Sequence, residues 1–155
     1  MKWIIILSCL LGSSAIGQEI NIGSVTNEVV LGPQAGNRDL AFGVKNILEE
    51  VIQDYGYDLN PNAETEIQVQ ILYFDVANTN LQIGVFGKQT DITKIIARAT
   101  IYKNGKKKKS VNAKGTAKSI SKSTLVVDQG GTFSQANVST ALKKLCEQLV
   151  NKLKL

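Results

Sequence analysis

The stretch DITKIIARATIYKNGKKKKSVNAKGTAKS, residues 91–119, decides the fold because two alternating segments flank a strong turn signal. The dipeptide Asn104-Gly105 favours a type I′ turn, in which both central residues take positive φ. Alternation over residues 91–102 and 107–119 gives each segment one face of apolar or small side chains. That face contains Ile95, Ala97, Ala99, Ile101, Val111, Ala113, Gly115 and Ala117. The stretch therefore predicts an antiparallel β-hairpin with one buried face.

A strict two-residue loop gives this hairpin a register in which the apolar faces disagree. It places Val111 opposite Arg98 and Ile101 opposite Lys108. A slip of one residue moves every side chain of a strand to the other face, so the mismatch is not tolerated by a buried sheet. We therefore expect a β-bulge or a longer loop near the turn.

A second strand signal precedes the hairpin. Residues 64–76 alternate so that Ile67, Val69, Ile71 and Tyr73 share one face, and the other face becomes apolar towards its end. This pattern predicts a central strand with partial cover on both faces. We expect residues 77–89 to be a connection, with a short strand through Leu81, Ile83, Val85 and Phe86 as the alternative.

Two segments have the period of amphipathic helices. Asn37 or Asp39 is expected to cap the first, which ends at about Tyr55. Ser134 is expected to cap the second, which ends at about Lys154. Both helices carry one apolar face and one polar face, so each is expected to pack on the sheet.

The order of the elements indicates the fold class. An extended segment over residues 19–30 comes before the first helix, so the order is strand, helix, three or four strands, helix. This order predicts a single α+β domain over residues 18–155. We expect a mainly antiparallel sheet of four or five strands with two helices packed on it.

Residues 1–17 have the pattern of a secretory signal peptide. Lys2 precedes an apolar run over residues 3–11, and small residues follow as far as Gly17. We expect cleavage after Gly17 and export to the periplasm or out of the cell. Cys9 loosely fits the box of a lipidated cysteine, so a membrane-anchored lipoprotein attached through Cys9 is the alternative.

The composition bears on the chemistry available to the chain. It contains no histidine, the commonest general base and zinc ligand. Lys2 is the one charged residue before Gln18, so the remaining chain has 17 basic and 13 acidic side chains. After Cys9, Cys146 is the one other cysteine, and it has no partner for an internal disulfide in the exported chain. We predict no catalytic, cofactor-binding or metal-ligating residue and no cofactor.

The densest charge run is formed by Lys106, Lys107, Lys108 and Lys109. These side chains are candidates for binding the anionic groups of a lipid or polymer. The alternative is a solvated hairpin tip, where lysines also oppose edge-to-edge pairing of strands. No aromatic residue is interleaved to stack on bases, so nucleic acid is not an expected partner.

Several sequence words resemble the YajG-type family of small exported bacterial lipoproteins. They are ILEEVIQDYGY (47–57), EIQVQILYFDV (66–76), TDITKIIARAT (90–100), the turn at 104–105 and KGTA (114–117), followed by a C-terminal helix. The resemblance covers about residues 20–150. It implies an envelope-associated, non-enzymatic α+β domain with no established biochemical activity and no catalytic residues. The placement of Cys9 departs from the family's lipidation box.

Three hypotheses for the function follow. The first is an exported, non-enzymatic module of the cell envelope that binds or assembles another envelope protein through a sheet face or a strand edge. The second is a binder of anionic polymer or lipid surfaces through Lys106–Lys109. The third is a hydrolase that uses carboxylates which the sequence does not identify.

Overall fold

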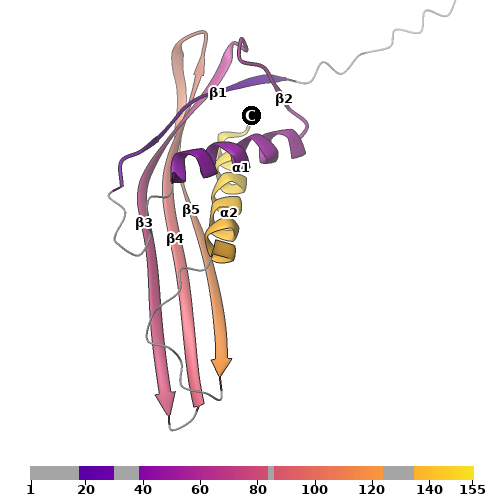
Figure 1. The fold of residues 1–155 in the computed structure, drawn as a ribbon. Coiled ribbons are helices and arrows are strands. Elements are labelled where there is room, and N and C mark those ends of the chain that lie inside the picture. The colour runs from indigo at the N-terminus through magenta and orange to yellow at the C-terminus, as the bar shows by residue number, and fades with distance from the viewer. Residues whose placement is uncertain (1–17, 30–38, 84–85, 124–134) are drawn as a thin grey trace, which may run out of the picture.

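Two helices and a five-stranded sheet make up the described part of the chain (Figure 1), which confirms the predicted α+β class. This computed structural model describes residues 18–29, 39–83, 86–123 and 135–155. The elements are β1 (Glu19–Asn27), α1 (Leu40–Asp54), β2 (Asp58–Leu59), β3 (Thr65–Ile83), β4 (Phe86–Lys103), β5 (Lys106–Ser123) and α2 (Gln135–Leu153). The predicted signal peptide with Cys9, and the predicted cap Ser134, lie outside the described residues.

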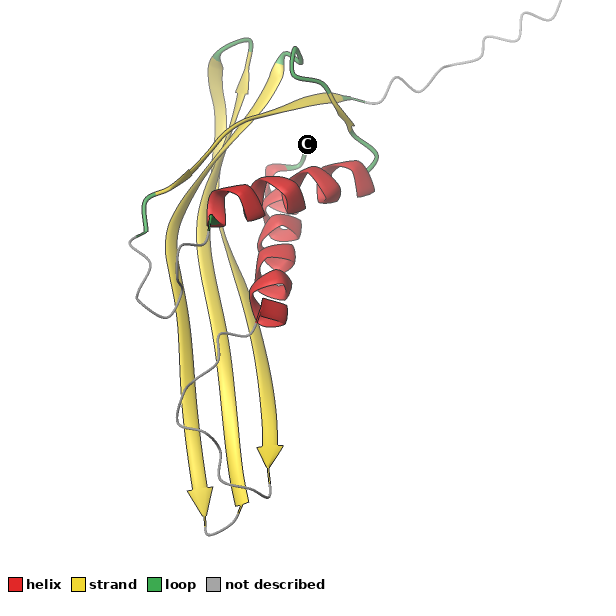
Figure 2. Ribbon diagram, in the orientation of Figure 1, coloured by secondary structure: helices red, strands yellow, loops and turns green. Residues whose placement is uncertain are grey.

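The sheet has the strand order β2-β1-β3-β4-β5 and is mixed (Figure 2). β1 runs parallel to both β2 and β3, because α1 forms the crossover that returns the chain beside its first strand. β3, β4 and β5 form an antiparallel meander through two hairpins. The expected mainly antiparallel sheet is therefore present, with two parallel pairings at one side.

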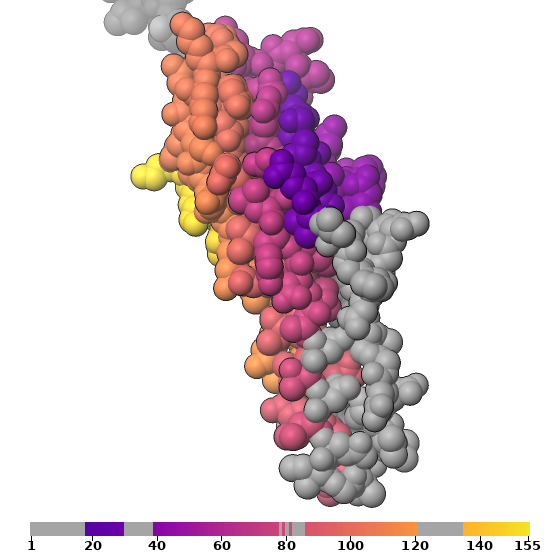
Figure 3. Space-filling view, turned by 90° about the vertical axis from the view of Figure 1, so that its left-hand side faces the viewer, coloured from indigo at the N-terminus to yellow at the C-terminus, as the bar shows by residue number. Residues whose placement is uncertain are grey.

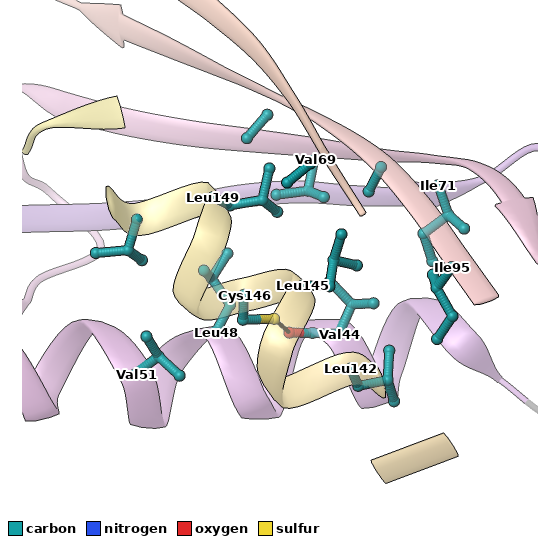
Figure 4. Close-up of a cluster of buried hydrophobic side chains, with 14 of the residues drawn as sticks. Val44, Leu48, Val51, Val69, Ile71, Ile95, Leu142, Leu145, Cys146 and Leu149 are labelled. Atoms are coloured by element: carbon teal, nitrogen blue, oxygen red, sulfur yellow. Dashed lines mark hydrogen bonds between the residues drawn. The ribbon is translucent and has the colours of Figure 1, made fainter. Parts of the chain in front are cut away.

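Both helices pack on the same face of the sheet. The side chain of Asp39, one of the two predicted caps, accepts a hydrogen bond from the Phe42 amide at 2.9 Å and begins α1. The core between the helices and the sheet contains Val44, Leu48 and Val51 of α1, Leu142, Leu145, Cys146 and Leu149 of α2, and Val69, Ile71 and Ile95 of the strands (Figure 4). These side chains account for the two helical stripes that the sequence indicated.

The prediction of cover on both faces of the central strand is wrong for the described part of the chain. β3 is central in the strand order, but no described helix lies over the opposite face, which Figure 3 shows from outside. Side chains there, such as those of Gln68 and Ile96, are only partly buried by their neighbours. The apolar residues towards the end of the pattern do not form a second layer, because the register shift between Ile71 and Tyr73 turns Phe74 towards the core, against which it packs.

Two register shifts set which side chains reach the core. Near the turn, Lys103 pairs with Lys106 and Ile101 with Lys109, so Lys108 is the extra residue of the predicted β-bulge. A second shift lies between Ile71 and Tyr73 of β3. It turns Tyr73 away from the core, where its exposed fraction is 39 %, so the prediction that Tyr73 shares the buried face is wrong.

The expected connection over residues 77–89 is also wrong. β3 continues to Ile83 and β4 starts at Phe86, so the alternative short strand is part of a long hairpin. Together with the end of β5, these strands extend past the N-terminal end of α2 (Figure 1). We call residues 79–83, 86–90 and 120–123 the arm.

Candidate functional site: the edges of the sheet

Three side chains of α2 cap the outer edge of β5. Lys152 Nζ donates to the Asn112 carbonyl at 2.8 Å, and Lys144 Nζ donates to the Thr116 carbonyl at 3.4 Å. Between them, the Lys114 amide donates to Gln148 Oε1 at 3.4 Å. Residues 144, 148 and 152 share one helix face, so α2 lies along the edge. Its side chains bond to the β5 backbone groups that a neighbouring strand would otherwise pair with. This part of the edge is closed to another strand.

From Ala117 to Ser123, no described element covers the same edge of β5. In an antiparallel ladder alternate residues point their backbone N–H and C=O groups away from the neighbouring strand. The capped residues define this set on β5, and Lys118 and Ile120 continue it. No described strand or side chain hydrogen-bonds to the outward groups of these two residues. The part of β5 from residue 117 to 123 is therefore an edge able to accept a strand.

The opposite edge is formed by β3 and is open over a matching length. β1 pairs with β3 as far as Ile71, whose carbonyl also accepts from the Glu28 amide at 3.3 Å. No described strand pairs with residues 75–83 on the side away from β4. Alternation along the ladder gives Val76 and Asn78 outward backbone groups. The two open edges thus lie on opposite sides of one three-stranded unit.

The arm also presents apolar side chains on the face away from the helices. Leu81, Phe86 and Ile120 are exposed by 56 %, 66 % and 49 %. Nearer the core, Tyr73 lies under Lys94, whose Nζ is 5.0 Å from the ring centroid. Desolvation, followed by the charge of Asp75, raises the pKa of the Tyr73 phenol above its ordinary value.

A polar cluster marks the place where the core ends and the arm begins. Asn137, near the start of α2, donates from Nδ2 to Ser119 Oγ at 2.8 Å and to the Asp91 carbonyl at 3.4 Å. The Asp91 carboxylate accepts from Gln89 Nε2 at 3.0 Å, and its residue is buried. These bonds satisfy polar groups at the rim of the core and position α2 on the sheet.

The lysine run does not form one uniform site. Lys106, Lys107 and Lys108 are exposed at the hairpin tip. Lys109 Nζ instead donates to the carbonyls of Lys152 and Leu153, where it caps the C-terminal end of α2. The structure therefore separates Lys109 from the three lysines that remain available to a ligand.

Cys146 lies in the core. Its side chain is fully buried, and its Sγ lies 3.8 Å from the Val44 carbonyl oxygen (Figure 4). Burial, with a smaller effect from Glu147, raises the pKa of the thiol to about 12. The thiol is therefore protonated near neutral pH and packs as a small apolar group.

Two further features bear on function. Within the described ranges, no group of three or more His, Cys, Asp and Glu side chains is arranged to hold a metal ion. The described helices include none that is long and apolar enough to cross a membrane.

The fold resembles those of several solved bacterial proteins. The hypothetical protein CT253 from Chlamydia trachomatis has a TM-score of 0.56 at 9 % identity, with 89 % of this chain and 96 % of that one covered. The minor lipoprotein from Acinetobacter baumannii has a TM-score of 0.53 at 9 % identity, with 88 % and 91 % covered. Protein XCC0632 from Xanthomonas campestris, of family DUF330, has a TM-score of 0.52 at 9 % identity, with 91 % and 85 % covered. At this identity the similarity shows a shared fold. No family model and no curated protein matches the chain.

The sequence pattern favours a sheet face or a strand edge as a way to bind a partner but does not locate the edge. The sequence signal that could locate the edge is the distribution of charged residues among the strands. β5 contains seven lysines and no acidic residue, whereas β1 and β3 contain Glu19, Glu66 and Asp75 and no basic residue. Strand order places the lysine-rich β5 at one edge of the sheet and the strands that contain these acidic residues on the other side of β4.

Proposed function

We propose that this chain is an exported, non-enzymatic module of a bacterial cell envelope that binds protein partners by adding a strand to its sheet. The selective capping of β5 carries the proposal. Lys144, Gln148 and Lys152 close the edge beside α2, and the same strand continues with backbone groups that no described residue binds. Folded proteins commonly protect such edges, so an open edge beside a capped one is suited to strand addition.

Export is the second part of the proposal. It is supported by the signal-like residues 1–17 and by a fold that this chain shares with a protein titled a minor lipoprotein. An intact mass measured on the exported protein tests it. A chain that begins at Gln18 supports free release, and acyl chains on Cys9 support a membrane anchor. Retention of residues 1–17 contradicts export by this route.

Partner binding is tested with a proline at the open edge. Proline at position 120 removes an outward N–H and leaves the ladder with β4 intact, whereas Ile120→Thr keeps the N–H and serves as the matched control. The immobilised exported chain is exposed to an envelope extract of its source. We expect one stoichiometric protein with the wild type and Ile120→Thr, and its loss with Ile120→Pro. Equal recovery by both variants contradicts binding through this edge.

A second candidate function is supported by the exposure of Lys106, Lys107 and Lys108. Three adjacent ammonium groups at a hairpin tip attract anionic lipid or polymer, and the attraction weakens as salt is added. Serine at the three positions is compared with wild type for sedimentation with anionic and neutral vesicles. Unchanged binding to anionic vesicles rules this function out. The hydrolase hypothesis assigned no residues and remains an untested prediction.

A further inference from the structure

We propose that the partner at the open edges is a second copy of this chain, with β5 of one copy beside β3 of the next. This inference deepens the proposed function by naming one partner for the same edges. Only residues 117–123 of β5 and 75–83 of β3 are involved, because α2 caps the rest of the β5 edge and β1 pairs with the earlier part of β3. Each open stretch is at least as long as a typical strand of about 5–6 residues.

Charge complementarity selects this pairing. Lys118 is exposed on β5 next to the open edge, and the neighbouring α2 adds Lys144. The β3 side presents Asp75, also exposed, which is the one charged residue of 75–83 and lies opposite Lys94 of β4. Opposite charges therefore meet when β5 approaches β3 of another copy.

Charge does not favour either of the two symmetric alternatives. Two β5 edges bring lysines together, and lysines on an edge strand are a common protection against self-pairing. Two β3 edges offer no lysine of the edge strand to Asp75, whose charge Lys94 of β4 compensates within each copy, so this pairing gains no attraction between opposite charges. The attractive arrangement is thus β5 with β3, a contact between two different surfaces.

Strand direction is compatible with this contact. β3 and β5 both run antiparallel to β4, so they are parallel to each other. A copy rotated about an axis along the strands presents its β3 to β5 as a parallel strand, the arrangement that β1 and β3 already have in the chain. Because the two surfaces differ, every added copy leaves one edge of each kind open, and the contact repeats until the assembly closes.

Two proline variants test the inference without knowledge of the register. Ile120→Pro blocks the β5 edge, and Asn78→Pro blocks the β3 edge, since both positions direct their N–H groups outward. We expect each variant alone to be monomeric in sedimentation and a mixture to form a one-to-one dimer, because each supplies the edge that the other lacks. Ile120→Thr and Asn78→Ser keep the N–H groups and are expected to assemble beyond the dimer, as the wild type does.

Each contrary result identifies what is wrong. A monomeric wild type at all concentrations overturns self-association, and the envelope capture described above then still decides the proposed function. Dimers of Asn78→Pro alone show β5 paired with β5, and dimers of Ile120→Pro alone show β3 paired with β3; either overturns the inference. Circular dichroism establishes that the variants are folded.

The salt dependence of self-association tests the inference on the wild-type protein. In about 1 M salt the screening length falls to about 3 Å, so the attraction between the edges is largely lost. We expect the dissociation constant of the wild type to rise at least about tenfold relative to low salt. Assembly that is equally strong in high salt contradicts the role assigned to charge.

Discussion

Gly115 of β5 lies so close to Ala141 of α2 that a Cβ atom on the glycine would be 1.8 Å from the Ala141 carbonyl oxygen. The backbone of the helix therefore rests almost directly on the strand. This contact sets the distance at which Lys144, Gln148 and Lys152 reach the edge of β5. The closure of that edge therefore depends on the close packing of α2 against Gly115.

Gly115→Ala is expected to destabilise the fold. The added methyl group meets backbone, so α2 must shift, and overpacking of this kind costs about 1–3 kcal/mol. Urea unfolding measures the change. Gly43→Ala in α1 is the control, since its Cβ would meet only the Leu142 side chain at 3.4 Å and alanine favours the helix. If the two variants are equally stable, the close approach is not a constraint.

Deletion of Lys108 is expected to keep the register of the hairpin and to be tolerated about as well as Lys108→Ser. The deletion removes the extra residue of the bulge, and a two-residue turn then keeps Ile101 opposite Lys109 and Val111 opposite Ala99, the native pairs. The serine variant keeps the bulge, and position 108 is exposed, so its stability is expected to stay within about 0.5 kcal/mol of wild type. Thermal unfolding of the two variants compares them directly, and a much lower midpoint for the deletion would contradict the view that the bulge serves only to set the register.

Cys146 is expected to resist alkylation until the protein unfolds. The fold raises the pKa of its thiol from 9.0 to about 12, so the native state favours the neutral form. The unfolded thiol loses its proton first, and stability should fall as the pH rises from about 9 towards 12. Cys146→Ala, measured by chemical unfolding across this range, should show a smaller fall. Identical pH profiles would contradict the shift.

Alanine at Lys144, Gln148 and Lys152 together is expected to open the upper edge of β5. Loss of the Gln148 acceptor should speed hydrogen exchange at the Lys114 amide, and the open edge should promote further association. Nuclear magnetic resonance measures the exchange. Lys143→Ala is the control because Lys143, on the same helix, makes an exposed ion pair with Glu50 at 3.6 Å and no described bond to the edge of β5. Unaltered exchange in the triple variant would show that these side chains do not protect the edge.

Local signals predicted the elements well where neighbouring residues determine them. Asn104-Gly105 located the tight turn, and both residues take positive φ, at 51° and 71°. The mismatch of Val111 and Arg98 predicted the bulge, because register follows from the apolar pattern. Asp39 was one of two caps proposed for α1. Each of these depends on interactions over a few residues.

Predictions failed where distant contacts decide the outcome. The sequence assigned Tyr73 to the buried face, but the register shift before it lies between paired strands and leaves no mark in the alternation of β3. Residues 77–89 contain weak apolar alternation, and this local pattern predicts a connection. Their strand structure is supported by pairing with β4 residues such as Thr90 and Ile92, which local propensity does not report.

The sequence by itself determined the kinds of element, the turn, the bulge, the buried stripes of both helices and the unequal charge of β3 and β5. These depend on side-chain periodicity and local backbone preferences, which short segments carry in full. Only the tertiary structure decided that β1 pairs with β3, that α2 closes part of the β5 edge and that parts of β3 and β5 have no described strand beside them. Strand order and edge protection come from contacts between residues far apart in the chain, so no local pattern contains them.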